Sequence, residues 1–335
     1  MDRPGLKVEQ CCKKILAGDR LALSHALTLL ESVKPTDQQE AKKLITACLP
    51  HIGNSVRIGI TGIPGVGKST FINAFGSYLT SIGKTVAVMA IDPSSSIGKG
   101  SILGDKTRMK DLVGDRNSFV RPTPSGNKLG GVADNTKESV VLFEAAGFDI
   151  IIIETVGSGQ SETDVYSLVD FFILLMQAGT GDWLQIMKKG VIELADAIIF
   201  NKSDGNNKEV TEIACKETRQ IAGMFTARNN GWETKVLQCS ALYMQGMEDC
   251  WQLLVEYLNL TRSNGWFDKN RNLQNKQWMK NCITKGLEQD FYQNVKVQKL
   301  MKKLYADIER DLINPLMAAE QLLDYYFSIE RKKKN

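Results

Sequence analysis

The sequence predicts an α/β fold in which a mainly parallel sheet carries helices on both faces, with helices before it and a helical arm after it. Three observations support this class. From about Val56 to Leu258, apolar strand-like runs alternate with helix-like segments, as in parallel sheets. The run 150–153 is continuously apolar, as expected of a strand buried on both faces. Polar and acidic residues follow such runs, where open α/β sheets bind ligands.

Residues 1–54 are predicted to form an N-terminal helical extension. Five side chains recur there at helical spacing, namely Val8, Cys11, Cys12, Ile15 and Leu16. Asp19 is expected to cap a second helix that runs through Leu30, and a third helix is expected from Asp37 to Leu49. We interpret these helices as packing elements rather than as a ligand site.

A phosphate-binding loop is predicted where the strand-like run around Ile58 meets a helix-like run. The chain there reads G-x-x-x-x-G-K-S, and its glycines let backbone N–H groups turn around a phosphate. Lys68 is expected to reach the β- and γ-phosphates, and Ser69 to contact Mg²⁺. The predicted nucleotide-binding residues here are Gly62, Ile63, Pro64, Gly65, Val66, Gly67, Lys68, Ser69 and Thr70. The fold is therefore predicted to be that of a P-loop NTPase.

Guanine is the predicted base, because a later strand-like run ends in the pattern N-K-x-D. The Asp204 carboxylate can accept hydrogen bonds from the N1–H and 2-amino groups of guanine, a donor pair that adenine lacks. Asn201 can reach the guanine edge, and the stem of Lys202 can lie along the base plane. A second base contact is expected after the strand-like run 235–238, at Ser240, Ala241 and Leu242. We therefore predict a GTPase with GTP and GDP as ligands.

Further residues near strand ends are predicted to act at the γ-phosphate. Glu154 occupies the position of the Mg²⁺-associated acid of P-loop proteins, and the backbone N–H of Gly157 is a candidate contact for the γ-phosphate. Asp92 and Asp105 are candidates for Mg²⁺ and its waters, because Mg²⁺ keeps several waters and few direct protein ligands. Asp105 has an equal alternative as the N-cap of a helix over 106–110.

Together these motifs resemble the MeaB/ArgK family of GTPases, which chaperone adenosylcobalamin-dependent methylmalonyl-CoA mutase and its relatives. The matching segments extend over nearly the whole chain: 16–20, 59–70, 92–96, 100–109, 129–133, 154–157, 159–162, 201–205 and 318–323. The resemblance implies a GTP-hydrolysing chaperone that gates cofactor loading or protection of an adenosylcobalamin-dependent mutase, and a homodimer. The predicted catalytic residues are Lys68, Asp92, Asp105, Glu154 and Gly157, and the predicted Mg²⁺ ligands are Ser69, Asp92, Asp105 and Glu154.

The third switch of the family, which faces the mutase, corresponds to residues 177–188 of this chain. The family usually has Pro-Gly-Ala-Gly-Asp-Glu-Leu-Gln-Gly-Ile-Lys in this region, and this sequence departs from it. Trp183 replaces the usual acid and 186–187 replaces Gly-Ile, whereas Asp182 and Lys188 remain. Outside the switch, Ser158 replaces a common Val. Trp183 is either an exposed interface anchor or a core tryptophan.

The domain organisation predicted from these patterns has three parts: the N-terminal extension 1–54, a GTPase domain over 55–260, and a C-terminal helical arm over 261–335. The turn-forming Ser263–Gly265 marks the start of the arm. One apolar helical stripe follows, formed by Val297, Leu300, Leu304, Ile308 and Leu312. The stripe either packs on the GTPase domain or belongs to a dimerisation arm, as the resemblance implies.

Composition limits the other functions that the chain could have. The formal net charge is +4 over 335 residues, and the basic run 331–334 is expected to be a solvated tail, so no nucleic-acid partner is predicted. No apolar run approaches the roughly 20 residues of a membrane span. Seven scattered cysteines and only two histidines argue against structural zinc. Reduced thiols and an acid near the N-terminus favour the cytoplasm.

The predicted reaction is hydrolysis of GTP to GDP and phosphate, without a covalent intermediate. Positioning and charge neutralisation would supply the catalysis. One alternative is a P-loop small-molecule kinase, against which the guanine-binding pattern N-K-x-D argues. Another is a metal-insertion GTPase for a different enzyme, which would usually need Cys and His ligands. The sequence identifies neither the residue that orients the attacking water nor the particular mutase.

Overall fold

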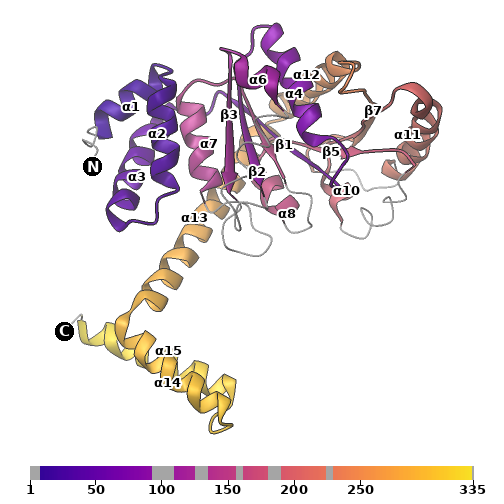
Figure 1. The fold of residues 1–335 in the computed structure, drawn as a ribbon. Coiled ribbons are helices and arrows are strands. Elements are labelled where there is room, and N and C mark those ends of the chain that lie inside the picture. The colour runs from indigo at the N-terminus through magenta and orange to yellow at the C-terminus, as the bar shows by residue number, and fades with distance from the viewer. Residues whose placement is uncertain are drawn as a thin grey trace. The chain divides into compact units, whose positions relative to one another are not determined.

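The computed structural model describes residues 8–92, 109–124, 135–155, 161–179, 190–223 and 229–333. The chain divides into two compact units, Met1–Asn270 and Arg271–Asn335. In the first unit, seven parallel strands form one sheet in the order β3-β2-β4-β1-β5-β6-β7, with helices on both faces (Figure 1). The predicted α/β class is therefore confirmed.

The strand order places the carboxyl end of β1 at the centre of the sheet. The strands are β1 (Val56–Gly62), β2 (Val86–Asp92), β3 (Ser118–Pro124), β4 (Ile150–Glu154), β5 (Phe171–Met176), β6 (Ala197–Phe200) and β7 (Lys235–Gln238). β2, β3 and β4 lie on one side of β1, and β5, β6 and β7 lie on the other. The direction of chain connection thus reverses at β1, which makes its carboxyl end the expected ligand-binding crevice.

The main core lies between one face of the sheet and helices α4 (Lys68–Ser81) and α12 (Met247–Ser263). It includes Ile58 and Ile60 of β1 and the stacked rings of Phe71 and Phe75, whose centroids lie 5.6 Å apart. Helices α7 (Thr136–Ala145) and α8 (Ser161–Tyr166) pack against the opposite face. This unit also contains the short elements α6 (Lys110–Gly114), α10 (Val191–Leu194) and the 3₁₀ helix η3 (Gly205–Asn207), and the longer helix α11 (Lys208–Ala222).

Three N-terminal helices cover the outer side of α7 (Figure 1). They are α1 (Val8–Leu16), α2 (Arg20–Leu30) and α3 (Pro35–Cys48), and the 3₁₀ helix η1 (Leu49–His51) follows them. The first two match the predicted helices. The third begins at Pro35 rather than Asp37, because proline is favoured at the first helical position. With the sheet on one side and these helices on the other, nine of the ten residues of α7 are buried.

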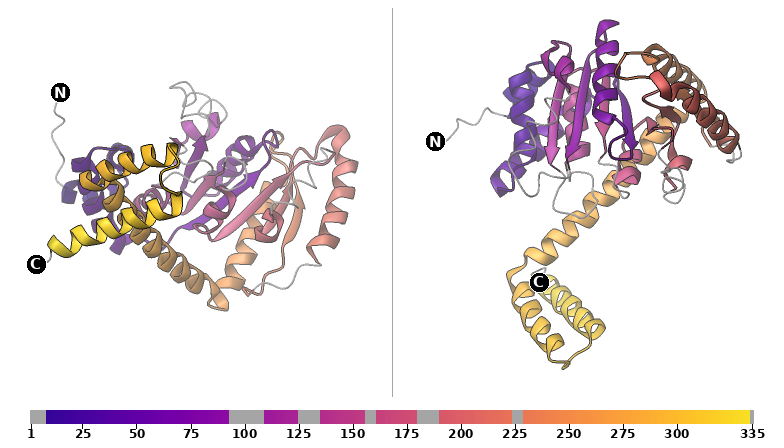
Figure 2. Two further views of the ribbon diagram at one scale, coloured as in Figure 1. Left: turned by 90° about the horizontal axis from the view of Figure 1, so that it is seen from below. Right: turned by 45° about the vertical axis from the view of Figure 1, so that its right-hand side comes forward.

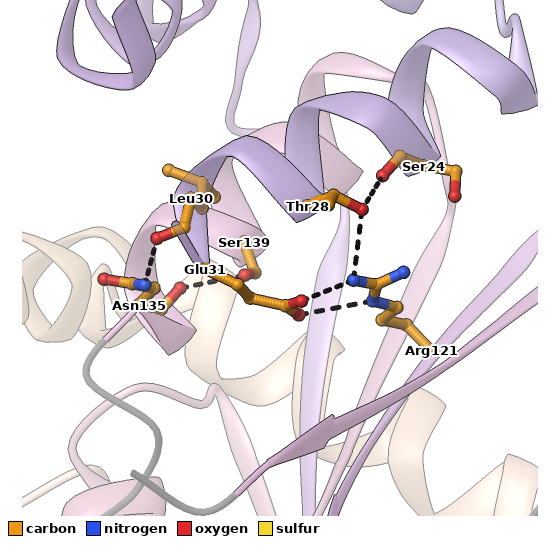
Figure 3. A network of polar contacts seen from close by, with 7 residues as sticks. All are labelled: Ser24, Thr28, Leu30, Glu31, Arg121, Asn135 and Ser139. Atoms are coloured by element: carbon orange, nitrogen blue, oxygen red, sulfur yellow. Dashed lines mark hydrogen bonds and ion pairs between the residues drawn. The ribbon is translucent and has the colours of Figure 1, made fainter. Parts of the chain in front are cut away.

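Polar contacts fasten α2 at two points (Figure 3). Arg121 of β3 donates to both carboxylate oxygens of Glu31, with N···O distances of 3.3 and 2.6 Å. The side-chain amide of Asn135, just before α7, donates to the carbonyl of Leu30. The end of α2 is therefore held both to the edge of the sheet and to the start of α7, which supports the predicted packing role of the extension.

Replacing Asp19 by alanine is expected to lower the melting temperature at neutral pH. The Asp19 carboxylate accepts hydrogen bonds from the N–H groups of Ala22 and Leu21, at 3.0 and 2.9 Å, and so caps α2. The hydrogen bond from Ala22 is the largest cause that lowers the pKa of Asp19. A lowered pKa contributes stability above the unfolded-state value of about 3.9, which is lost as the pH falls through the folded-state value. The difference from wild type should therefore shrink in thermal unfolding experiments at acid pH.

Asn at this position is the matched control, because its side chain caps helices but does not titrate. At neutral pH, the melting temperature of Asp19→Asn should stay close to that of wild type. Equal destabilisation by Asp19→Asn and Asp19→Ala would contradict a capping role.

Strand β3 was not identified from the sequence. It carries Pro122 and Pro124, and prolines weaken a strand assignment because they donate no ladder hydrogen bond. In the described part of the sheet, β3 pairs with β2 alone and forms an edge. Proline is tolerated on an edge strand, so the position of β3 explains why its composition is unusual.

The second unit contains most of α13 (Trp266–Gln293), followed by α14 (Val295–Glu309) and α15 (Pro315–Lys333). α14 and α15 lie side by side (Figure 2). Four of the five stripe residues pack in a cluster with Ala318, Leu322 and Tyr326 of α15: Val297, Leu300, Leu304 and Ile308. The fifth, Leu312, is exposed. The stripe therefore has a packing partner inside its own unit, which neither of the two sequence-based alternatives considered.

Over the described ranges, none of the helices combines the length and apolar character that crossing a bilayer requires.

Candidate nucleotide-binding site

The predicted phosphate loop connects β1 to α4 and uses glycine where other residues would not fit. Gly65 and Gly67 have φ values of +84° and +94°, a region in which a side chain is strained. At Gly67 space is also restricted, because a Cβ would lie 2.7 Å from Nδ2 of Asn201. Lys68 then begins α4. The unpaired N–H groups at the start of this helix form a suitable anion site.

The side chain of Lys68 folds back onto the loop and is 9% exposed. Its Nζ atom donates to the carbonyls of Gly62 and Ile63, at 2.8 and 3.3 Å. Burial lowers the pKa of Lys68, while the carboxylates of Glu154 and Glu162 act in the opposite direction. A phosphate in the loop would give this ammonium a stronger anionic partner than the two carbonyls, which suits it to neutralise phosphate charge.

Glu154 ends β4 and lies beside the first turn of α4. The Ser69 hydroxyl donates to Oε1 of Glu154 at 3.1 Å. Next to it, Oγ1 of Thr155 donates to Oγ1 of Thr61 at 2.8 Å, which joins the ends of β4 and β1. Hydroxyl and carboxylate oxygens are the hard ligands that Mg²⁺ prefers, so Ser69 and Glu154 fit the predicted metal.

The other predicted acids and Gly157 are not placed. Asp105, Gly157 and the side chain of Asp92 lie outside the described residues. In the ranges that the structure covers, no three or more His, Cys, Asp or Glu side chains gather in a way that could hold a metal ion. The proposed roles of Asp92, Asp105 and Gly157 therefore stay predictions.

Asn201 links the predicted guanine-binding segment to the phosphate loop. Its Nδ2 donates to the carbonyl of Val66 at 3.0 Å, and its Oδ1 accepts from the N–H of Ala241 at 3.1 Å. The residue is buried. Because both ends of its amide have partners within the protein, these contacts give Asn201 a bridging position. Direct contact with guanine stays a prediction.

Lys202 and Asp204 complete this side of the site. Lys202 adopts φ +60°, and its Nζ donates to the carbonyl of Gly65 at 2.7 Å. The Asp204 carboxylate accepts a hydrogen bond from the Ser240 hydroxyl at 2.5 Å. Ser240 and Ala241 are buried, whereas Leu242 is 71% exposed. The structure thus brings Asn201, Lys202, Asp204, Ser240 and Ala241 together with the phosphate loop, and leaves Leu242 largely in solvent.

Two side chains near the site were not singled out from the sequence. Glu162, in α8, is buried and close enough to raise the pKa of Lys68. Gln177, just after β5, accepts a hydrogen bond from Nζ of Lys202 at 2.8 Å. Glu162 ends the family-matching segment 159–162, and Gln177 begins the segment that corresponds to the family's third switch. Glu162 could have been found from the sequence, because it is the acidic residue of the polar run 159–162. No local sequence pattern pointed to Gln177.

A glycine-rich loop at the switch point of a parallel sheet, with an N-K-x-D segment held against it, defines a P-loop GTPase. A protein-family model described as methylmalonyl Co-A mutase-associated GTPase MeaB matches residues 23–296. The chain belongs to this MeaB family. It is therefore a GTPase and binds guanine nucleotides.

Individual relatives match almost the full chain. A "Probable GTPase Rv1496" of Mycobacterium tuberculosis is 42% identical over 317 residues, which cover 95% of this chain and 94% of the relative. The GTPase ArgK of Escherichia coli is 38% identical, with coverages of 93% and 95%. A mouse protein named methylmalonic aciduria type A homolog, mitochondrial, is 35% identical, with coverages of 96% and 80%. A solved structure titled LAO/AO transport system kinase superposes with a TM-score of 0.75 at 31% identity, covering 97% of this chain and 99% of the other.

Proposed function

We propose that this GTPase is a chaperone of an adenosylcobalamin-dependent acyl-CoA mutase of the methylmalonyl-CoA mutase type. Its hydrolytic cycle would gate loading or protection of the mutase's cofactor. The observation that carries the proposal is the match to a family described as mutase-associated over residues 23–296. The mouse relative, named for methylmalonic aciduria, supports the same direction.

The described residues support a division of roles in GTP hydrolysis. Lys68 and the start of α4 bind the β- and γ-phosphates, while Asp204, oriented by Ser240, binds the guanine edge. Ser69 and Glu154, with Asp92 and Asp105, would hold Mg²⁺, which when bound neutralises phosphate charge. Catalysis then depends on positioning and electrostatic stabilisation, and no side chain forms a covalent bond to the substrate.

A kinase that phosphorylates a small molecule is the main competing proposal, because one structural relative is titled a kinase. The two functions differ in where the γ-phosphate goes. Release of inorganic phosphate from GTP with no acceptor present supports a GTPase. Transfer of labelled phosphate to a metabolite, without free phosphate, would contradict the proposal.

A homodimer is also proposed, and the second unit offers apolar surface for it. Large side chains on α13, α14, α15 and the turn before α15 are more than half exposed: Leu287, Tyr292, Val295, Tyr305, Leu312, Leu316, Met317 and Phe327. A dimer interface that covers these side chains would remove their apolar area from water, which is favourable. Sedimentation equilibrium of the full chain distinguishes a dimer from a monomer, and a monomer at micromolar concentration would contradict this part of the proposal.

The segment 177–188 is proposed to transmit the signal of the mutase. Most of it lies outside the described residues, including Trp183 and Lys188, so its role rests on the family resemblance. Trp183→Ala and Lys188→Ala are expected to leave GTP hydrolysis without mutase within a few-fold of wild type, and to abolish most of the stimulation by mutase. Aromatic side chains and long cations commonly anchor interfaces. The measurement is phosphate release with and without purified methylmalonyl-CoA mutase.

Lys216→Ala, on the exposed side of α11, is the matched control for loss of a lysine and should retain stimulation. Full stimulation of both switch variants would contradict the assignment of this segment. Loss of hydrolysis in the absence of mutase would instead place the two residues in the nucleotide site.

A further inference from the structure

The ammonium of Lys202 joins three parts of the molecule. Its Nζ donates to the carbonyl of Gly65 in the phosphate loop at 2.7 Å, and to Oε1 of Gln177 at 2.8 Å. Gln177 is the first residue after β5. It is also the first residue of the segment 177–188. One side chain of the N-K-x-D pattern therefore contacts both the phosphate loop and the beginning of the proposed switch.

The sheet and the local backbone set the geometry of this junction. Met176 and Phe200 are paired in register, and the N–H of Asn201 donates to the carbonyl of Met176 at 2.8 Å. The ends of β5 and β6 thus place Gln177 next to Asn201 and Lys202. Lys202 then takes its left-handed φ of +60°, a conformation that costs free energy for a residue with a side chain. The contacts with Gly65 and Gln177 offset that cost.

The two acceptors restrict where the Lys202 side chain can go. Hydrogen bonds from a charged donor are stronger than neutral ones, and Gln177 and Lys202 are both partly buried. With both acceptors present, the aliphatic stem is confined between its backbone and a fixed ammonium. Without Gln177, the carbonyl of Gly65 is the one described acceptor that remains for the ammonium. The aliphatic stem of Lys202 can then move away from the position in which it would lie along the guanine base.

We propose that Gln177 is a positioning residue for the guanine nucleotide, which holds Lys202 in place and thereby slows the release of GDP. This inference rests on the proposed contact of Lys202 with the base and deepens it.

The test compares Gln177→Leu with Gln177→Glu in the full chain. Leu has a similar size and cannot accept a hydrogen bond, whereas Glu accepts from an ammonium more strongly than Gln does. Stopped-flow dissociation of a fluorescent GDP analogue should be about 10-fold faster for Gln177→Leu, the change expected for loss of one charged hydrogen bond. Gln177→Glu should be no faster than wild type. Gln220→Leu, the same substitution on the exposed face of α11, should dissociate GDP at the wild-type rate.

A double-mutant cycle with Lys202→Met shows whether Gln177 affects GDP binding through Lys202. It is measured as GDP dissociation constants by calorimetry, so that weak binding remains measurable. In the Lys202→Met background, Gln177→Leu should cause no further loss of affinity. The inference is overturned if Gln177→Leu leaves the GDP dissociation rate unchanged, if Gln177→Glu accelerates it equally, or if the full effect persists without Lys202.

These outcomes are separable from failure of the proposed function. None of the exchange measurements contains mutase, so an absent mutase response would contradict the chaperone proposal and leave the role of Gln177 standing. Equal affinity of the wild type for GDP and ADP would instead remove the base-binding role of the N-K-x-D segment. In that case the role of Gln177 would fall with it.

Discussion

Lys68→Ala is expected to abolish GTP turnover, with a fall in kcat of at least about 100-fold, the usual cost of losing one preorganised charge-stabilising donor. Among the described side chains of the phosphate loop, Lys68 is the one cation, and its Nζ is already directed at the loop carbonyls of Gly62 and Ile63. Alanine removes the donor without adding bulk.

The experiment measures phosphate release at saturating GTP, with thermal unfolding of each variant as a check on folding. Lys216→Ala, which removes an exposed lysine from α11, should turn over GTP at the wild-type rate. Turnover by Lys68→Ala within a few-fold of wild type, in a folded protein, would show that the γ-phosphate is not bound at this loop.

Asp204→Asn is expected to lower the affinity for GDP by about 30-fold or more, which corresponds to roughly 2 kcal/mol for the loss of charge-assisted hydrogen bonds. The carboxylate accepts from Ser240 at 2.5 Å and is thereby oriented. Asparagine would turn an NH₂ group towards the 2-amino group of guanine. Xanthine carries a carbonyl at that position, so the same substitution should improve binding of xanthosine diphosphate relative to GDP.

Calorimetric titration of both proteins with GDP, ADP and xanthosine diphosphate tests this prediction. Asp268→Asn, an exposed residue of α13, makes the same change of charge and should leave all three affinities unaltered. If the wild type bound GDP and ADP equally, Asp204 would not be the guanine-reading residue.

The sheet was predictable because its strands leave strong local signals. The run 150–153 is apolar throughout and is buried throughout, since the sheet is covered on both faces. The same local logic located the cap of α2 at Asp19, which does accept two backbone hydrogen bonds. The phosphate loop followed from glycine spacing, and Gly67 is indeed a position where backbone angle and space both require glycine.

What the sequence did not predict depends on contacts between distant segments. Arg121 and Glu31 are 90 positions apart, and no local pattern indicates that they pair. The stripe on α14 was recognised, but its partner on α15 is set by how the chain folds back within the second unit. The proposed role of Gln177 likewise depends on its contact with Lys202, which lies 25 residues later in the sequence. The two residues meet because β5 and β6 end side by side.

The attachment of α2 to the start of α7 has a consequence for synthesis of the chain. Leu30 and Asn135 are joined by a hydrogen bond although they are 105 positions apart. At translation rates of about 5 to 20 residues per second, the N-terminal helices leave the ribosome roughly 5 to 20 seconds before the segment that buries them. Their apolar faces are without that partner during this interval. Nascent chains arrested before α7 has left the ribosome and after it has left should therefore differ in protease resistance of the first 50 residues, with protection appearing once α7 has emerged.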